Sequence, residues 1–97
     1  MKECSSLEEL RAEVDKVDDQ IVDLIAERNR YIHQASKFKQ SVDEIKADDR
    51  IEAVMDRVRH RAVTQGVSPN LLTQLYRLMI DEMVEAEIAE FRNRNTF

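Results

Sequence analysis

The sequence predicts an all-α protein, and three observations support this fold class. The chain of 97 residues contains one glycine and one proline, which leaves almost no residues for the tight turns that join β-strands. The strong helix formers Ala, Leu, Glu, Arg, Lys, Gln and Met predominate. Hydrophobic residues make up 42% of the chain and charged residues 36%, which is too apolar for a disordered protein and too polar for a membrane protein.

The first predicted helix begins at a capping-box pattern. In the segment Ser6-Leu7-Glu8-Glu9, the side chains of Ser6 and Glu9 can each satisfy the free amide of the other residue. Neither glycine nor proline interrupts the chain from there to about Lys39, where we expect the helix to end. The following stretch, residues 40–47, is predicted to be a short loop.

Two further helices complete the single domain predicted for residues 1–97. The second helix begins near Asp48-Asp49, because carboxylates suit the positive end of the helix dipole. It ends at Gly66, since glycine commonly takes the left-handed position after a helix. The third helix begins at Ser68-Pro69, with the serine as N-cap and the proline as the first helical residue, and continues to about Arg92.

The apolar residues of the first helix predict a dimer. A helix of about 34 residues is roughly 50 Å long, whereas a compact domain of this size is roughly 30–35 Å across. The helix is therefore too long for one globule, and we expect a homodimer in which two long helices share a core. The apolar positions step alternately by three and four residues, as in a heptad seam: Leu7, Leu10, Val14, Val17, Ile21 and Leu24.

Charge and targeting signals narrow the possible partners. The formal net charge is −5, which argues against a nucleic-acid partner because such a protein needs a basic surface. The sequence has neither an apolar run long enough for a membrane span nor a hydrophobic signal region, so we expect a soluble cytoplasmic protein without a membrane partner. No metal site is expected, because the cysteine and the histidines lack ligand spacing: Cys4, His33 and His60.

Two cations occupy unexpected positions on the first helix. Continuing the heptad pattern past Leu24 places Arg28 where a hydrophobic residue is expected, so this charge needs a partner. A buried ion pair or a polar residue that sets the register explains Arg28 equally well. Lys39 follows eleven residues later and should share the same helix face, with Ile32 and Ala35 between the two cations. This arrangement predicts an anion pocket above an apolar floor.

A carboxylate interrupts the apolar face of the third helix. Glu87 follows Met83 by four residues and Val84 by three, and Phe91 comes four residues later. A carboxylate at such a position must be paired, protonated or directed into a cavity. A buried ion pair with an arginine remains the alternative to a functional role.

Together these residues resemble the all-helical chorismate mutase family. In that family, three helices per chain form an intertwined homodimer with two sites, each built from both subunits. The resemblance therefore implies the same fold and a small dicarboxylate substrate. It covers nearly the whole chain through five motifs in order: Leu10-Arg11, Ala26-Glu27-Arg28, Lys37-Phe38-Lys39, Arg50, and Ile80-Asp81-Glu82 followed by Glu87.

The resemblance implies a role for each matching residue. Arg28, with Arg11 of the partner subunit, would bind the two carboxylates of a chorismate-like substrate. Lys39 would donate a hydrogen bond to the ether oxygen of the breaking C–O bond, and Arg50 would line the other side of the substrate. Glu87 stands where many members have glutamine as a second donor to that oxygen, and some members carry glutamate.

One departure from the family pattern indicates the subtype. Typical chorismate mutases follow the arginine at position 50 with a glutamate that binds the ring hydroxyl, whereas this chain has Ile51. The isochorismate pyruvate lyases that form salicylate have an apolar residue there. They share the Tyr-x-x-x-Ala-Ser-x-Phe-Lys pattern of residues 31–39 and a similar spacing from Lys39 to Arg50. We also predict that Met83 contacts the substrate, together with Arg11, Arg28, Arg50 and Ile51.

The sequence thus predicts a cofactor-free isochorismate pyruvate lyase that converts isochorismate to salicylate and pyruvate. A chorismate mutase, which converts chorismate to prephenate, is the alternative. A non-catalytic helical dimerisation module would explain the apolar seam equally well. Such a module would not explain why Arg28, Lys39 and Glu87 occupy positions on apolar stripes.

Overall fold

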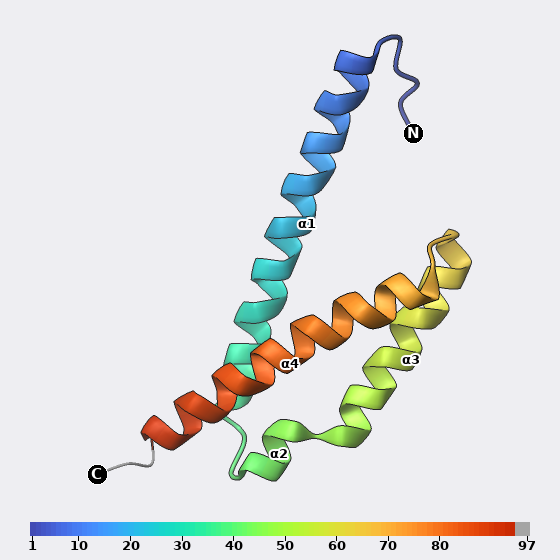
Figure 1. The fold of residues 1–97 in the computed structure, drawn as a ribbon. Coiled ribbons are helices and arrows are strands. Elements are labelled where there is room, and N and C mark those ends of the chain that lie inside the picture. The colour runs from blue at the N-terminus through green and yellow to red at the C-terminus, as the bar shows by residue number, and fades with distance from the viewer. Residues whose placement is uncertain (95–97) are drawn as a thin grey trace. The chain divides into compact units, whose positions relative to one another are not determined.

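The computed structural model describes residues 1–94, which contain four helices and no strand (Figure 1). The all-α prediction is confirmed. The chain divides into two compact units, of which the first covers residues 1–32 and the second begins at His33. The helices are α1 (Leu7–Ser36), α2 (Val42–Lys46), α3 (Asp48–Gln65) and α4 (Pro69–Arg94).

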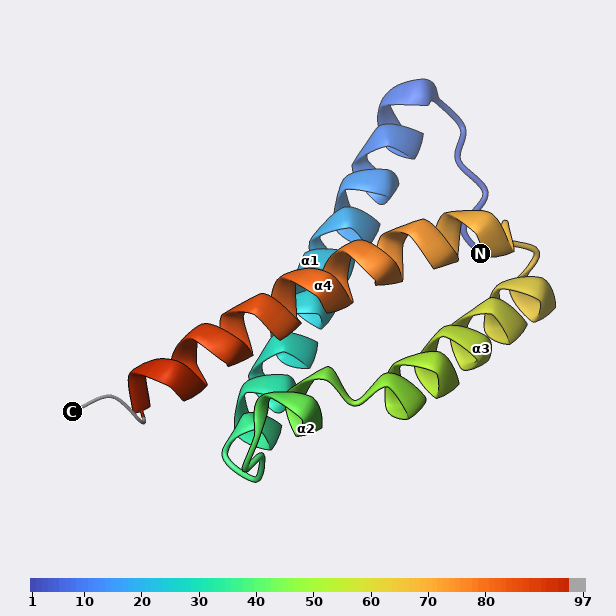
Figure 2. The same ribbon diagram turned by 60° about the horizontal axis from the view of Figure 1, so that its bottom comes forward.

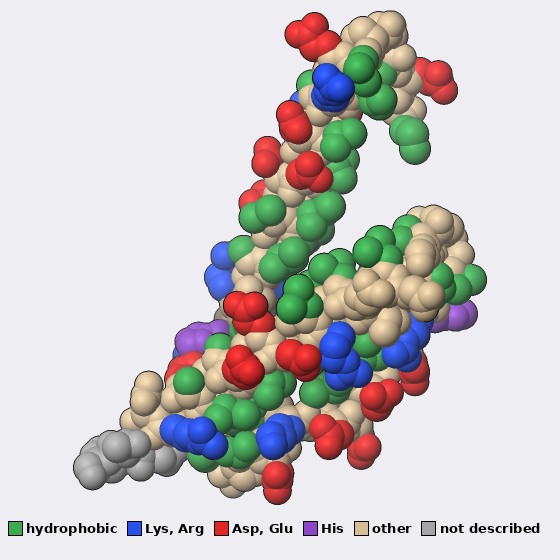
Figure 3. Space-filling view, viewed as in Figure 1, with side chains coloured by type: hydrophobic (Ala, Val, Ile, Leu, Met, Phe, Trp, Pro, Cys, Tyr) green, Lys and Arg blue, Asp and Glu red, His purple; other side chains and the backbone are tan. Residues whose placement is uncertain are grey.

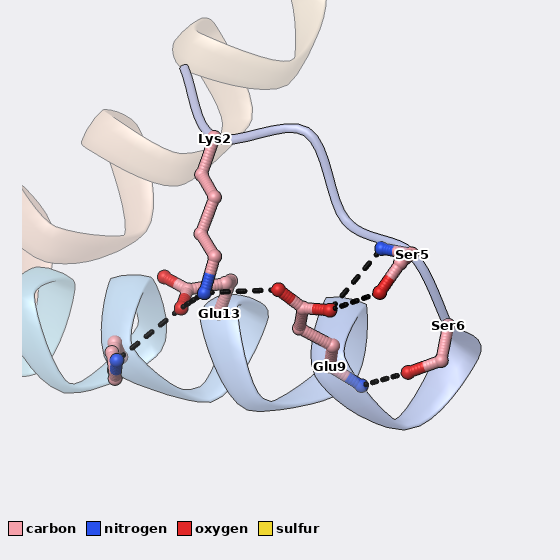
Figure 4. Close-up of polar contacts among 6 residues, drawn as sticks. Lys2, Ser5, Ser6, Glu9 and Glu13 are labelled. Carbon is pink, nitrogen blue, oxygen red and sulfur yellow. Dashed lines mark hydrogen bonds and ion pairs between the residues drawn. The ribbon is translucent and has the colours of Figure 1, made fainter.

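The N-terminus of α1 has a modified capping box. The hydroxyl of Ser6 accepts a hydrogen bond from the backbone N–H of Glu9 at 3.1 Å, as predicted (Figure 4). The Glu9 carboxylate does not complete the box at Ser6, but accepts the backbone N–H of Ser5 at 3.2 Å and its hydroxyl at 2.8 Å. Lys2 lies 3.0 Å from the same carboxylate. The Ser5 hydroxyl bond, followed by Lys2, holds the pKa of Glu9 below its ordinary value.

The predicted seam of α1 is exposed in the single chain. Its six apolar side chains are between 47% and 63% exposed. Figure 3 shows hydrophobic side chains along one side of this helix and acidic ones along the opposite side. Among the described residues, no helix is both long enough and apolar enough to cross a membrane.

The C-terminus of α1 differs from the prediction. The helix ends at Ser36 rather than at Lys39. The amides of Lys37, Phe38 and Lys39 bond to carbonyls three residues back, which winds the chain more tightly than an α-helix. Lys39 therefore lies outside α1, and the prediction that the first helix extends to Lys39 is wrong. The helical spacing from Arg28 no longer determines the direction of the Lys39 side chain.

The predicted loop at residues 40–47 contains the short helix α2. The hydroxyl of Ser41 caps this helix by accepting the backbone N–H of Glu44 at 3.1 Å, and the Glu44 carboxylate accepts the backbone N–H of Gln40 at 2.6 Å. Ile45 is 3% exposed, and α2 packs on α4 (Figure 2). Two caps and one buried side chain therefore stabilise a helix whose length alone would not.

The connection between α3 and α4 agrees with the prediction. Gly66 has a φ of 70°, and its backbone N–H reaches the carbonyls of Ala62 and Val63. The hydroxyl of Ser68 caps α4, which begins at Pro69. The two helices pack side by side, and α4 continues to Arg94, two residues beyond the predicted end. The core of the second unit consists of Ile45, Met55, Ala62 and Ile80.

Two left-handed positions allow a matched test of stability. Ala47 has a φ of 34°, and this conformation costs an L-residue roughly 1–2 kcal/mol but costs glycine little. Ala47→Gly should therefore raise the free energy of unfolding, and Gly66→Ala should lower it by about 1 kcal/mol. A Cβ at Gly66 would meet no atom within 4 Å. The stability lost in Gly66→Ala therefore comes from the backbone conformation and not from a steric clash. Urea unfolding measures both, and an unchanged Gly66→Ala variant would contradict this backbone geometry.

Candidate active site

Glu87 is a buried carboxylate on α4. The residue is 6% exposed and lies on the same helix face as Ile80, Met83 and Val84. This burial agrees with the predicted place of Glu87 on the apolar face of the helix. A buried carboxylate needs a partner or a proton, so the groups around Glu87 determine its chemistry.

Lys39 approaches Glu87 from the turn that follows α1. Its Nζ lies 3.8 Å from Oε2 of Glu87, which is an ion-pair distance but too long for a hydrogen bond. The same Nζ donates a hydrogen bond to the backbone carbonyl of Glu44 on α2 at 3.3 Å. The turn and α2 together hold the ammonium group beside the carboxylate, and the Lys39 side chain is 25% exposed.

The environment of Glu87 favours its neutral form. Burial raises the pKa of the Glu87 carboxyl, Lys39 lowers it, Glu90 raises it and His33 lowers it. The burial effect is the largest, and the resulting pKa lies above the ordinary value. Glu87 therefore retains its proton to a higher pH than an exposed glutamate.

His33 and Glu90 form a second pair next to this one. His33 lies in the last turn of α1, and its Nδ1 is 3.1 Å from Oε2 of Glu90. No pattern in the sequence joins His33 to Glu90. The spacing of three residues between Glu87 and Glu90 places these two carboxylates on adjacent turns of one helix, and this spacing could have drawn attention to Glu90 but not to His33.

The other predicted site residues are spread over both units. In the second unit, Arg50 is exposed in the first turn of α3, while Ile51 and Met83 are half-buried. In the first unit, Arg11 is exposed and Arg28 is half-buried. The structure brings Lys39 and Glu87 together, and the roles of all seven residues remain predictions. Residues 1–94 contain no group of three or more His, Cys, Asp or Glu side chains placed to hold a metal ion.

The Lys39–Glu87 pair can present two hydrogen-bond donors to one acceptor. An ammonium group always donates, and a carboxyl group donates when it is protonated. Two donor atoms 3.8 Å apart can both lie about 2.8 Å from a single oxygen atom. The pair therefore suits an oxygen on which negative charge develops, because charge strengthens both hydrogen bonds.

Comparison with known proteins assigns this arrangement to a family. The sequence model of chorismate mutase type II matches residues 10–88, which include Lys39 and Glu87. The chain belongs to this family. An isochorismate pyruvate lyase from Pseudomonas aeruginosa is 26% identical over 91 residues, covering 94% of this chain and 90% of the relative. A chorismate mutase from Methanocaldococcus jannaschii is also 26% identical, over 93 residues that cover 92% of this chain and 94% of the relative.

Membership in the type II chorismate mutase family and both relatives indicate an enzyme of the chorismate mutase type with a chorismate-like substrate. The two relatives carry different activities at the same identity, so similarity alone does not choose between them. The choice depends on the residues of this chain.

Proposed function

We propose that the protein is an isochorismate pyruvate lyase, which converts isochorismate to salicylate and pyruvate without a cofactor. The Lys39–Glu87 pair, whose two donors can converge on one oxygen, supports the breaking of an ether bond. The observation that carries the choice of isochorismate is Ile51, which follows Arg50 where a glutamate would bind the ring hydroxyl of chorismate. The similarity to the Pseudomonas aeruginosa lyase supports the same reaction.

The proposed reaction does not require a covalent bond between the protein and the substrate. The ether C–O bond of isochorismate breaks, a ring hydrogen moves to the methylene carbon, and the ether oxygen becomes the carbonyl oxygen of pyruvate. No nucleophile or base is required. Catalysis then rests on holding the substrate in a reactive conformer and on fixed donors at the oxygen that gains negative charge. Lys39 and Glu87 are the proposed donors.

The remaining proposed residues bind and orient the substrate. A dicarboxylate needs cations, and the planar guanidinium group matches a carboxylate with two parallel hydrogen bonds. We assign the carboxylates to Arg28 and to Arg11 of the partner subunit. Arg50 lines the substrate, and Met83 supplies an apolar contact one helical turn before Glu87.

Ile51 supports isochorismate rather than chorismate as the substrate. A glutamate at this position would bind the ring hydroxyl of chorismate, and isoleucine has no group that can do so. Ile51→Glu should therefore raise kcat/KM for chorismate relative to isochorismate by about tenfold, the value of one good hydrogen bond. Prephenate formation and salicylate formation measure the two rates. An unchanged ratio would contradict the lyase assignment, and Ile51→Leu serves as the control.

The second candidate function is chorismate mutase, which the Methanocaldococcus jannaschii relative favours. Both reactions break the same kind of ether bond, so the same donor pair serves either of them. The non-catalytic dimerisation module is less favoured, because it gives no reason to bury Glu87 beside Lys39 at an energetic cost.

We also propose that the protein is a homodimer. The six seam side chains of α1 are about half exposed, and burying the rest would contribute roughly 1 kcal/mol for each side chain. Their sum is comparable to the whole stability of a small domain, which is about 5–15 kcal/mol. A second copy of the chain offers a matching seam. In such a dimer, Arg11 of each subunit would contribute to the active site of the other subunit.

Subunit mixing tests the shared site. Arg11→Ala and Lys39→Ala should each be nearly inactive alone. When the two are unfolded and refolded together, half of the dimers are mixed, and each mixed dimer has one site without a substitution. The mixture should therefore recover about a quarter of the wild-type activity. Mixed dimers that form by native mass spectrometry but show no recovery would place Arg11 and Lys39 in the same subunit's site.

A further inference from the structure

Two carboxylates lie on consecutive turns of α4 but in different surroundings. The side chain of Glu87 is 7% exposed, whereas that of Glu90 is 39% exposed. Two carboxylates this close do not ionise independently, because each negative charge disfavours the other. A negative charge on Glu90 therefore raises the pKa of the Glu87 carboxyl, in addition to the larger effect of burial.

Glu90 is the better solvated of the two carboxylates. Water reaches its side chain, and His33 places Nδ1 at 3.1 Å from Oε2. The backbone of His33 is restrained in turn, since its carbonyl accepts the hydroxyl of Ser36 at 2.6 Å and Ser36 is 4% exposed. Glu90 is thus held next to Glu87 by a contact from the end of α1.

Few contacts stabilise the charged form of Glu87. Its cation, Lys39, stands 3.8 Å away and already donates to the carbonyl of Glu44 at 3.3 Å. Oε2 of Glu87 accepts no hydrogen bond, so the charged form lacks the stabilisation that such bonds give. The charge on Glu90 then adds to the cost of ionising Glu87.

We propose that Glu90, in contact with His33, is a positioning residue whose negative charge opposes ionisation of the buried Glu87 carboxyl and so favours its donor form. This inference rests on the proposed donor role of Glu87. The charged groups that act on Glu87 are Lys39 from the turn, His33 from α1 and Glu90 from α4. The charged side chains of α2 and the first turn of α3 are exposed: Asp43, Glu44, Lys46, Asp48, Asp49 and Arg50.

Glu90→Gln removes the charge and keeps the contact. Glutamine has nearly the size and shape of glutamate and can keep an oxygen facing Nδ1 of His33, so the variant should fold as the wild type does. In the full-length protein, carbon-detected NMR titration of the Glu87 carboxyl should show a lower pKa in Glu90→Gln than in the wild type. Glu85→Gln, an exposed glutamate of the same helix, is the control and should leave the Glu87 titration unchanged. An equal titration of Glu87 in Glu90→Gln and wild type would overturn the proposal.

Activity gives the second readout. With isochorismate, the fall in kcat at rising pH should move to lower pH in Glu90→Gln. In a Glu87→Gln background the additional Glu90→Gln change should not move the profile, whereas a merely structural role of Glu90 would lower kcat at every pH. A wild-type profile that is flat would refute the donor role of Glu87, but the NMR titration would still decide whether Glu90 controls its proton.

Discussion

Lys39→Ala should lower kcat with isochorismate by a factor on the order of 10²–10³, which is the usual cost of removing one preorganised donor at a developing negative charge. The ammonium group lies beside Glu87 and donates to the Glu44 carbonyl, so its position is restrained before the substrate binds. KM should change less than kcat, because the ether oxygen carries little charge before the bond breaks. Steady-state kinetics measures both constants.

Lys37→Ala is the matched control for this experiment. Lys37 lies in the same turn and is exposed, so its removal changes net charge equally but should leave kcat within about twofold of the wild type. Thermal unfolding of both variants checks that the fold is retained. Near-wild-type turnover in a folded Lys39→Ala variant would show that Lys39 does not contact the reacting oxygen.

The pH dependence of Glu87 is the second large effect. Burial raises the pKa of this carboxyl, and a bound dianion raises it further, so the neutral donor is present on the acidic side. Above the pKa in the complex, the ionised group faces the growing negative charge of the ether oxygen. We therefore expect kcat to fall as pH rises through this pKa.

Glu87→Gln tests this account, because an amide donates at every pH. The variant should have a flat profile between about pH 5 and 8 and should match or exceed the wild type near pH 7. The Glu87→Gln variant should also be more stable than the wild type at neutral pH. The folded wild type binds the Glu87 proton more tightly than the unfolded chain does, because the pKa of this carboxyl is raised in the folded protein. The wild type therefore loses stability as pH rises above the ordinary carboxyl pKa. A flat wild-type profile, or loss of turnover in Glu87→Gln, would instead make Glu87 the ionised partner of Lys39.

The caps of the long helices could be predicted because they depend on local chemistry. Gly66 takes the left-handed conformation expected of it, and Ser68 caps α4 as its side chain predicts. The helix α2 could not be predicted, because its five residues depend on the burial of Ile45 against α4. The end of α1 at Ser36 likewise depends on a tightened turn that periodicity does not reveal.

The candidate site was predictable only in part. The period of 3.6 residues placed Glu87 on the apolar face of α4, and the structure agrees. The sequence placed Lys39 on a face of the first helix. In the structure, the turn after α1 and a hydrogen bond to the carbonyl of Glu44 hold Lys39 beside Glu87. The His33–Glu90 contact joins segments far apart in the sequence, so no local pattern could predict it.

Product analysis with both substrates tests the proposed activity most directly. Purified full-length protein is incubated separately with isochorismate and with chorismate, and salicylate, pyruvate and prephenate are followed over time. The account predicts equal amounts of salicylate and pyruvate from isochorismate, with a higher kcat/KM than for prephenate formation from chorismate. Prephenate as the dominant product, with no salicylate above the uncatalysed rate, would contradict the account.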